Sequence, residues 1–194
     1  MERNPEITVL LKDACEGDQD AYSKVFSLIY AELRTIARHI RSKFYGNETL
    51  NTTAIVHEAY LKLVGSETDW NSRNHFYGVA GKAMRQILLN AASKKTAEKR
   101  GGGVDQEPLV EGENEVALSE ETSEQVLKLE EALQKLETID RQQARIVECR
   151  FYAGMSVQET ASALNISSAT VKRRWRTTKV WLYSILKSRM PIQA

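Results

Sequence analysis

The side chains best suited to act on another molecule lie near the carboxyl end of the chain, where basic residues gather without acidic ones. Positions 167–189 hold seven Lys or Arg residues and no Asp or Glu. An exposed helix usually mixes the two signs, because opposite charges one turn apart attract each other. An all-basic face instead suits contacts with nucleic-acid phosphates and base edges. The residues that we predict to contact duplex DNA are Ser167, Ser168, Thr170, Lys172, Arg173, Arg176 and Lys179.

Two short helices are predicted to hold this basic face in place. Ser156 and Glu159 have the spacing of a capping box, which satisfies the first backbone N–H groups of a helix. Asn165 follows in a turn and can adopt a left-handed conformation, and Ser167 then caps a second helix. The apolar stripe of that second helix comprises Val171, Trp175, Leu182, Ile185 and Leu186. The pattern is typical of a helix-turn-helix whose second helix enters the major groove of DNA.

Charge is distributed unevenly along the chain. The formal net charge is +1, yet residues 1–69 carry −3, residues 70–101 carry +6, residues 102–140 carry −10 and residues 141–194 carry +8. One basic block alone could be an ordinary solvated face. Two basic blocks on either side of an acidic one indicate two separate places that contact phosphates.

Apolar residues recur at helical spacing through the first hundred residues, and no stretch alternates as a β-strand does. We expect long helices near 22–40, 51–64 and 76–99, and two further helices over 127–152 before the helix-turn-helix. The predicted fold class is therefore all-α.

The chain is predicted to form two small helical domains joined by a linker. Segment 102–125 contains eight acidic residues, one proline and no Lys or Arg, so little of it could fill a core. Such a composition favours a flexible acidic linker. The expected domains are a helical bundle at 1–101 and a small helix-turn-helix domain at 126–190.

Few residues offer catalysis or metal binding. His57 and Glu58 begin a zinc-protease pattern, but Leu61 stands where the second histidine is needed. No nucleophile and base have supporting context, so we expect no enzyme activity, no metal and no cofactor. Cys15 and Cys149 lie far apart, which suits free thiols in a reducing compartment. The chain lacks an apolar run of about 18 residues and a signal-peptide pattern, so we expect a cytoplasmic protein without membrane insertion.

Two stretches of the chain resemble one known family. Segment 133–187, which includes LQKLETIDRQQARIVECRFYAGMSVQETASALNISSATVKRRW, resembles region 4 of bacterial RNA polymerase sigma factors. The first half is similar to region 2 over LLKDACEGDQDAYSKVFSLIYAELRTIAR, TTAIVHEAYLKLV and NHFYGVAGKAMRQILLNAASKKTAEKRGGG. Both regions, in this order, indicate the extracytoplasmic-function (ECF) group of the sigma-70 family. The resemblance implies a non-enzymatic subunit that binds core RNA polymerase and promoter DNA, and it leaves open an anti-sigma factor as a further partner.

The resemblance also implies roles for individual residues. Segment 51–64 would dock on the polymerase clamp, and its polar contacts would be His57, Glu58 and Lys62. The residues implied to hold a flipped base of the minus-10 promoter element are Arg73, Asn74 and Tyr77. The residues implied to follow the backbone of the opened strand are Lys82, Arg85, Lys94, Lys95, Lys99 and Arg100. The helix-turn-helix would read the minus-35 element as duplex.

Two features depart from the family pattern. Segment 55–58 reads Ile-Val-His-Glu where the family often has an acidic residue followed by Gln and Glu, so the clamp contacts would differ. The helix after Phe76 offers few aromatic rings, so capture of the opened strand would depend more on charge than on stacking. The alternative interpretation is a stand-alone helix-turn-helix regulator that binds duplex DNA as a dimer. Both a packed and a mobile arrangement of the two halves are compatible with the sequence.

Overall fold

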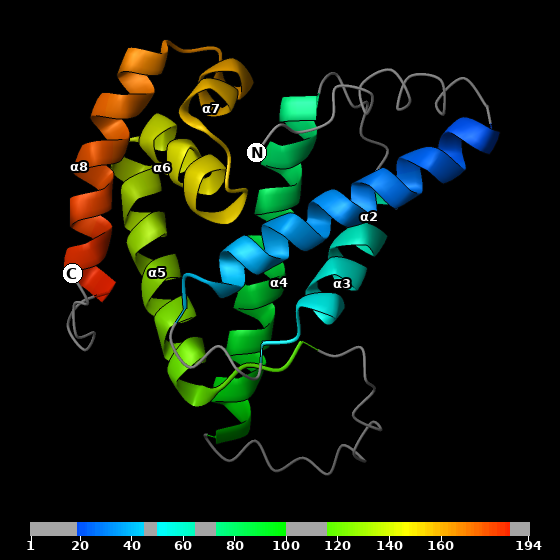
Figure 1. The fold of residues 1–194 in the computed structure, drawn as a ribbon. Helices are drawn as coiled ribbons and strands as arrows, with labels where there is room; N and C mark the ends of the chain where they lie inside the picture. The colour runs from blue at the N-terminus through cyan, green and yellow to red at the C-terminus, as the bar shows by residue number, and fades with distance from the viewer. Residues whose placement is uncertain (1–18, 45–49, 65–72, 100–115, 187–194) are drawn as a thin grey trace.

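The computed structural model describes residues 19–44, 50–64, 73–99 and 116–186, and Figure 1 draws the remainder as a thin grey trace. All regular structure in these residues is helical, and they contain no β-strand. The elements are α2 (Gln19–Arg41), α3 (Thr52–Val64), α4 (Arg73–Lys99), α5 (Glu120–Ile139), α6 (Arg141–Val147), the π-helix η2 (Glu148–Tyr152), α7 (Val157–Leu164) and α8 (Ser168–Leu186). The expected all-α fold class is confirmed.

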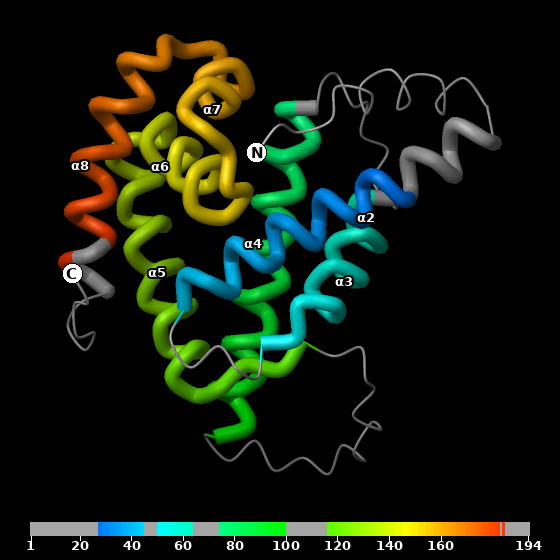
Figure 2. Tube along the Cα trace, in the orientation of Figure 1, coloured from blue at the N-terminus to red at the C-terminus, as the bar shows by residue number. Residues whose placement is uncertain are grey.

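Helix α4 belongs to the first half of the chain and lies along the second half (Figure 1). It contacts α2 and α3 from the first half, and α5, η2 and α7 from the second half. The tube in Figure 2 shows α4 and α5 running side by side over much of their length. The two halves are therefore packed against each other, which is one of the two arrangements that the sequence allowed.

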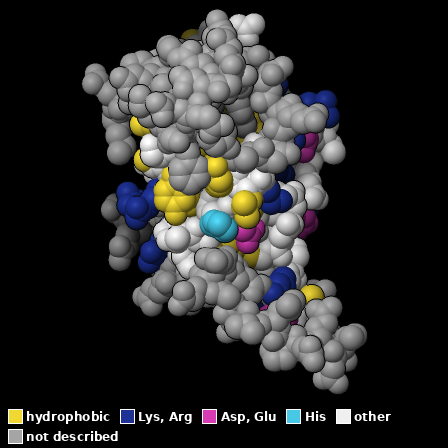
Figure 3. All heavy atoms as spheres, turned by 90° about the vertical axis from the view of Figure 1, so that its right-hand side faces the viewer, with side chains coloured by type: hydrophobic (Ala, Val, Ile, Leu, Met, Phe, Trp, Pro, Cys, Tyr) yellow, Lys and Arg dark blue, Asp and Glu magenta, His cyan; other side chains and the backbone are white. Residues whose placement is uncertain are grey.

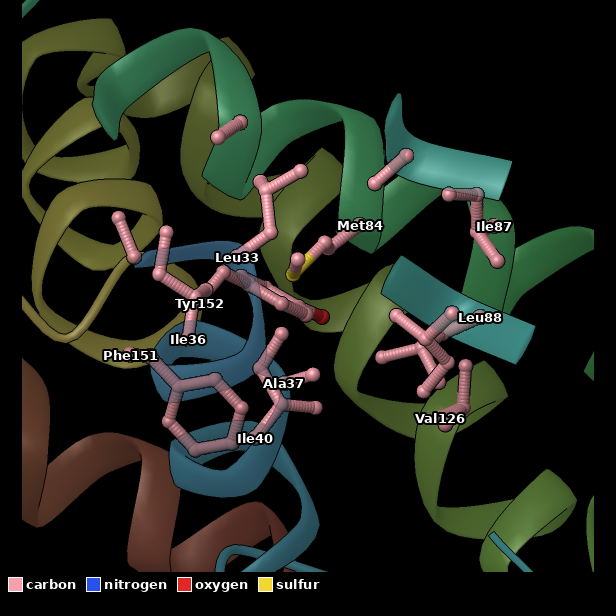
Figure 4. Close-up of a cluster of buried hydrophobic side chains, with 14 of the residues drawn as sticks. Leu33, Ile36, Ala37, Ile40, Met84, Ile87, Leu88, Val126, Phe151 and Tyr152 are labelled. Atoms are coloured by element: carbon pink, nitrogen blue, oxygen red, sulfur yellow. The ribbon is translucent and has the colours of Figure 1, made fainter. Parts of the chain in front are cut away.

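One hydrophobic core extends through both halves. Leu33 and Ile36 of α2, Met84 of α4, and Tyr152 of η2 are each no more than 1% exposed and belong to the same cluster. Figure 4 shows these side chains pointing toward one another from three separate elements. Val126 of α5 belongs to the cluster as well. Because the halves share one core, separating them exposes apolar surface of both.

Helix α5 begins earlier than the sequence analysis predicted. It starts at Glu120 rather than near residue 126, because the Ser119 hydroxyl accepts a hydrogen bond of 3.1 Å from the backbone N–H of Thr122. Val116 and Leu118 just before it are buried, so this part of the acidic segment does contribute to the core. The rest of the linker expected over 102–125, namely 102–115, lies outside the described residues.

The helix predicted over 141–152 is divided in two. After α6 the backbone continues as the π-helix η2, a type of element that is frequent at functional sites. Gly154 follows η2 with a φ of +62°, and a Cβ atom there would lie 3.1 Å from the His39 ring. A glycine at this position therefore allows both the left-handed backbone and the close approach of α2.

Candidate nucleic-acid interface

The turn of the helix-turn-helix is built as its sequence predicts. Ser156 and Glu159 form the capping box: the Glu159 backbone N–H donates to the Ser156 hydroxyl at 3.2 Å, and the Ser156 backbone N–H donates to the Glu159 carboxylate at 2.7 Å. Asn165 ends α7 with a φ of 52°. The Ser167 hydroxyl then accepts from the backbone N–H of Thr170 at 3.1 Å. Local hydrogen bonds thus fix the direction in which α8 leaves the turn.

A small apolar cluster holds α7 against α8. Ile146, Ala161 and Val171 are buried in it, and Trp175 packs against them. The Arg150 guanidinium lies 5.4 Å from the centre of the Trp175 ring and also donates a hydrogen bond to the carbonyl of Met155. A cation over an aromatic face is attracted to the ring quadrupole. The inner face of α8 is therefore tied to the chain segment that precedes α7.

The outer face of α8 carries the predicted basic residues. Exposed side chains on this face are those of Lys172, Arg173, Arg176 and Lys179. Within the described residues none of the four forms an ion pair. Ser167, just before the helix, is exposed too, and Ser168 and Thr170 in its first turn are half-buried. The structure thus brings all seven residues predicted for duplex DNA to the end of the turn and to the part of α8 that ends at Lys179.

Arg174 differs from its basic neighbours because it faces inward. It forms an ion pair with Asp140, whose carboxylate also accepts from the backbone N–H of Gln143 at 3.0 Å and so caps α6. Burial alone would raise the pKa of the Asp140 carboxyl, but the hydrogen bonds from Gln143 and Arg174 lower it below its ordinary value. The Gln143 amide donates to the buried Thr178 hydroxyl at 2.6 Å. These contacts set the position of α8 across α6, and the sequence patterns had not singled out any of them.

The residues predicted for the minus-10 element are divided between surface and interior. Those exposed on α4 are Lys82, Lys94, Lys95 and Lys99. Asn74 at its start is half-buried, Arg73 has no described side chain, and Arg100 lies outside the described residues. Lys99 forms an ion pair with Glu120, but both side chains are more than half exposed. An exposed pair of this kind is weak, so a phosphate could replace the carboxylate.

Two of the predicted minus-10 residues are not at the surface of this structure. Tyr77 is fully buried, with its ring centre 5.6 Å from that of Phe76, so it cannot hold an extruded base in this conformation. It lies on the same side of α4 as Ala80 and Met84, which form the core. Arg85 is only 12% exposed, because its guanidinium binds two carboxylates of the second half. Both positions therefore depart from the surface location that the family resemblance had implied.

Helix α3 presents a surface of a different kind. His57 and Lys62 are exposed and Glu58 is half-buried, and Leu61 between them is 57% exposed. Figure 3, which views the molecule from the side of α2 and α3, shows histidine, acidic, basic and apolar side chains close together. Mixed polar and apolar surfaces are typical of protein partners, whereas DNA contacts are dominated by positive charge.

A family model described as ECF sigma factor matches residues 4–188 of the chain. The chain belongs to the ECF sigma factor family. A search among curated proteins and a search among solved structures each found no match. Because the family match covers both halves and the segment between them, this ECF sigma factor has a role in transcription initiation. The family assignment made from the sequence is confirmed.

Other kinds of site were sought in the described part of this sigma factor. There, no three His, Cys, Asp or Glu side chains gather as metal ligands would. Burial raises the pKa of the Cys149 thiol to about 12, which keeps it protonated and unreactive at neutral pH. None of the helices in the described ranges has the length and hydrophobicity that a membrane span requires.

Proposed function

We propose that this ECF sigma factor binds core RNA polymerase and directs it to promoters. In this proposal α8 reads the minus-35 element as duplex, exposed lysines of α4 hold the opened minus-10 strand, and α3 docks on the polymerase clamp. The observation that carries the proposal is the outer face of α8, a row of exposed basic side chains on a helix with a fixed direction. Phosphate contacts position such a helix, and contacts with base edges give it sequence preference.

Binding to core polymerase tests this proposal directly. The purified chain is mixed with promoter fragments in the presence and absence of core enzyme, and binding and transcript formation are measured. We expect specific binding and transcription only with core enzyme, because two modest DNA contacts gain from being held together. Specific binding to an operator by the chain alone, as a dimer, would instead support a stand-alone regulator. The salt concentration must be held constant, since phosphate contacts depend steeply on it.

Substitutions on the outer face of α8 test how the minus-35 element is read. Arg173→Ala or Arg176→Ala should each weaken binding to a preferred minus-35 sequence by about 1–3 kcal/mol if the side chain contacts a base edge. The measurement is the affinity of the holoenzyme for a set of fragments that differ only in that element. Lys135→Ala is the control, because Lys135 is equally basic but lies exposed on α5 next to Glu131. An equal loss on every sequence would reassign the arginine to a phosphate contact.

A further inference from the structure

Arg85 forms ion pairs with two glutamates, and these contacts join the two halves. Its Nε and Nη2 atoms donate to the two carboxylate oxygens of Glu130 on α5 at 2.8 and 2.9 Å. Its Nη1 atom donates to the carboxylate of Glu148 on η2 at 2.5 Å. The guanidinium is thus bound on two edges, once in the bidentate geometry that arginine forms with carboxylates and phosphates alike.

The surroundings of this network make it strong. The side chains of Arg85, Glu130 and Glu148 are 12%, 11% and 19% exposed, and the fully buried Tyr152 lies beside them. Burial alone would lower the pKa of the Arg85 guanidinium, but the hydrogen bond and charge of Glu130 and the charge of Glu148 raise it above its ordinary value. Charges interact more strongly where water is excluded. Both glutamates therefore stay bound to Arg85 while the two halves remain packed.

The same network distinguishes Arg85 from the other basic residues of its helix. Lys82 and Lys95 are exposed on α4, and the Lys95 Nζ atom lies 4.0 Å from a carboxylate oxygen of Glu98 on the same helix. Arg85 lies between these positions in sequence, yet it is covered by acidic side chains of the other half. The bidentate Glu130 carboxylate offers Arg85 one negative charge and two acceptor oxygens, as a backbone phosphodiester would, and Glu148 adds a second carboxylate.

We propose that Glu130 and Glu148 act as an internal substitute for a nucleic-acid phosphate at Arg85, so that the free chain is closed and Arg85 meets DNA only after α5 and η2 separate from α4. The inference rests on the proposed function of α4 as the helix that holds the opened strand. In the closed chain the outer face of α8 stays exposed. The device therefore controls the minus-10 contact selectively, and a partner that stabilises the separated halves would release it.

The test compares two double variants of the full chain that change the net charge equally. Glu130→Gln with Glu148→Gln removes both carboxylates from Arg85. Glu131→Gln with Glu137→Gln is the control, because both of these glutamates are exposed on α5. Affinity for a single-stranded oligothymidine is measured by fluorescence anisotropy across a salt series, without polymerase, and the radius of gyration is measured by X-ray scattering.

We expect the Glu130→Gln, Glu148→Gln variant to expand and to bind the oligonucleotide more tightly than the control. Its plot of log affinity against log salt should be steeper by about 0.7, the slope that one additional single-strand phosphate contact contributes. Adding Arg85→Ala should remove the extra slope while the chain stays expanded. Glu148→Gln alone leaves the bidentate Glu130 contact, so it should increase the affinity and the salt slope by a smaller amount. This single variant replaces the double variant in the test if the double variant fails to fold.

Three results would overturn the proposal: no expansion relative to the control, no additional salt dependence, or a gain that persists after Arg85→Ala. A mere structural ion pair would give expansion or loss of stability without an Arg85-dependent change in salt slope. These measurements use no polymerase. If the chain fails to bind core enzyme, the proposed function is refuted. The radius of gyration and the salt slopes still decide whether Glu130 and Glu148 cover Arg85 in the free chain.

Discussion

Replacing Tyr152 with alanine is expected to lower the free energy of unfolding by about 3–5 kcal/mol, the usual cost of deleting a large buried aromatic ring. The side chain is 1% exposed and lies where α2, α4 and η2 meet, beside Leu33, Ile36 and Met84 (Figure 4). The cavity left behind would adjoin both halves. Urea unfolding followed by circular dichroism measures the loss.

Tyr152→Phe is the matched control, because it keeps the ring and removes only the hydroxyl. Its cost should be far smaller than that of Tyr152→Ala, because the ring still fills the space between the helices and no large cavity forms. Calorimetry adds a second readout: since the halves share one core, the wild-type chain should unfold in a single transition. Two separate transitions, or a loss below about 1 kcal/mol for Tyr152→Ala, would contradict the shared core.

Two glycines of α4 are expected to respond to alanine in opposite directions. A Cβ atom at Gly81 would lie 2.8 Å from the Cβ of Ala153 and 3.0 Å from its backbone nitrogen, so α4 and the end of η2 would have to move apart. A Cβ atom at Gly78 would meet nothing within 4 Å. Gly78→Ala should therefore stabilise the chain by about 0.5–1 kcal/mol through helix propensity.

Gly81→Ala should instead destabilise the chain by about 1–3 kcal/mol. The cost of forcing a methyl group against Ala153 exceeds the stabilisation that alanine gives a helix. Thermal and urea unfolding of both variants measure the two effects. The pair is a close comparison, since both substitutions are identical in chemistry and lie one turn apart on the same helix. Equal stabilisation by the two substitutions would show that α4 and η2 do not touch in solution.

The helix-turn-helix could be predicted well because its signals are local. Ser156 and Glu159 are three residues apart, Asn165 needs only its own backbone preference, and Ser167 caps the residue three positions ahead. Each of these contacts lies within one turn of helix, where sequence spacing and spatial distance agree. The exposed basic face of α8 then follows from the same register that buries Val171.

The environment of α4 could not be predicted in the same way because its partners are distant in sequence. Arg85 and Tyr77 stand in a basic segment that the family resemblance assigns to DNA, and nothing nearby indicates burial. The residues that cover Arg85 are 45 and 63 positions away. Periodicity identifies an inward face, but it does not identify what packs against it.

The start of α5 was missed for a different reason. Its first turns bury polar residues, namely Thr122, Ser123 and Gln125, so the apolar periodicity that marks a helix begins only at Val126. The acidic residues before that point favoured a linker by composition. Ser119 followed by two glutamates is a recognisable helix start, since a capping hydroxyl and acidic first-turn residues both stabilise an N-terminus.

The shared core also determines the order in which the nascent chain can fold. Helix α4 ends at Lys99 and η2 begins at Glu148, so the apolar side of α4 around Met84 is synthesised well before the segment that covers it. At about 5–20 residues per second, the ribosome needs several seconds to make the intervening stretch. During that interval α2 and α4 have apolar surface that η2 will later cover. Early nascent chains are therefore expected to be substrates for ribosome-associated chaperones until Tyr152 has left the exit tunnel.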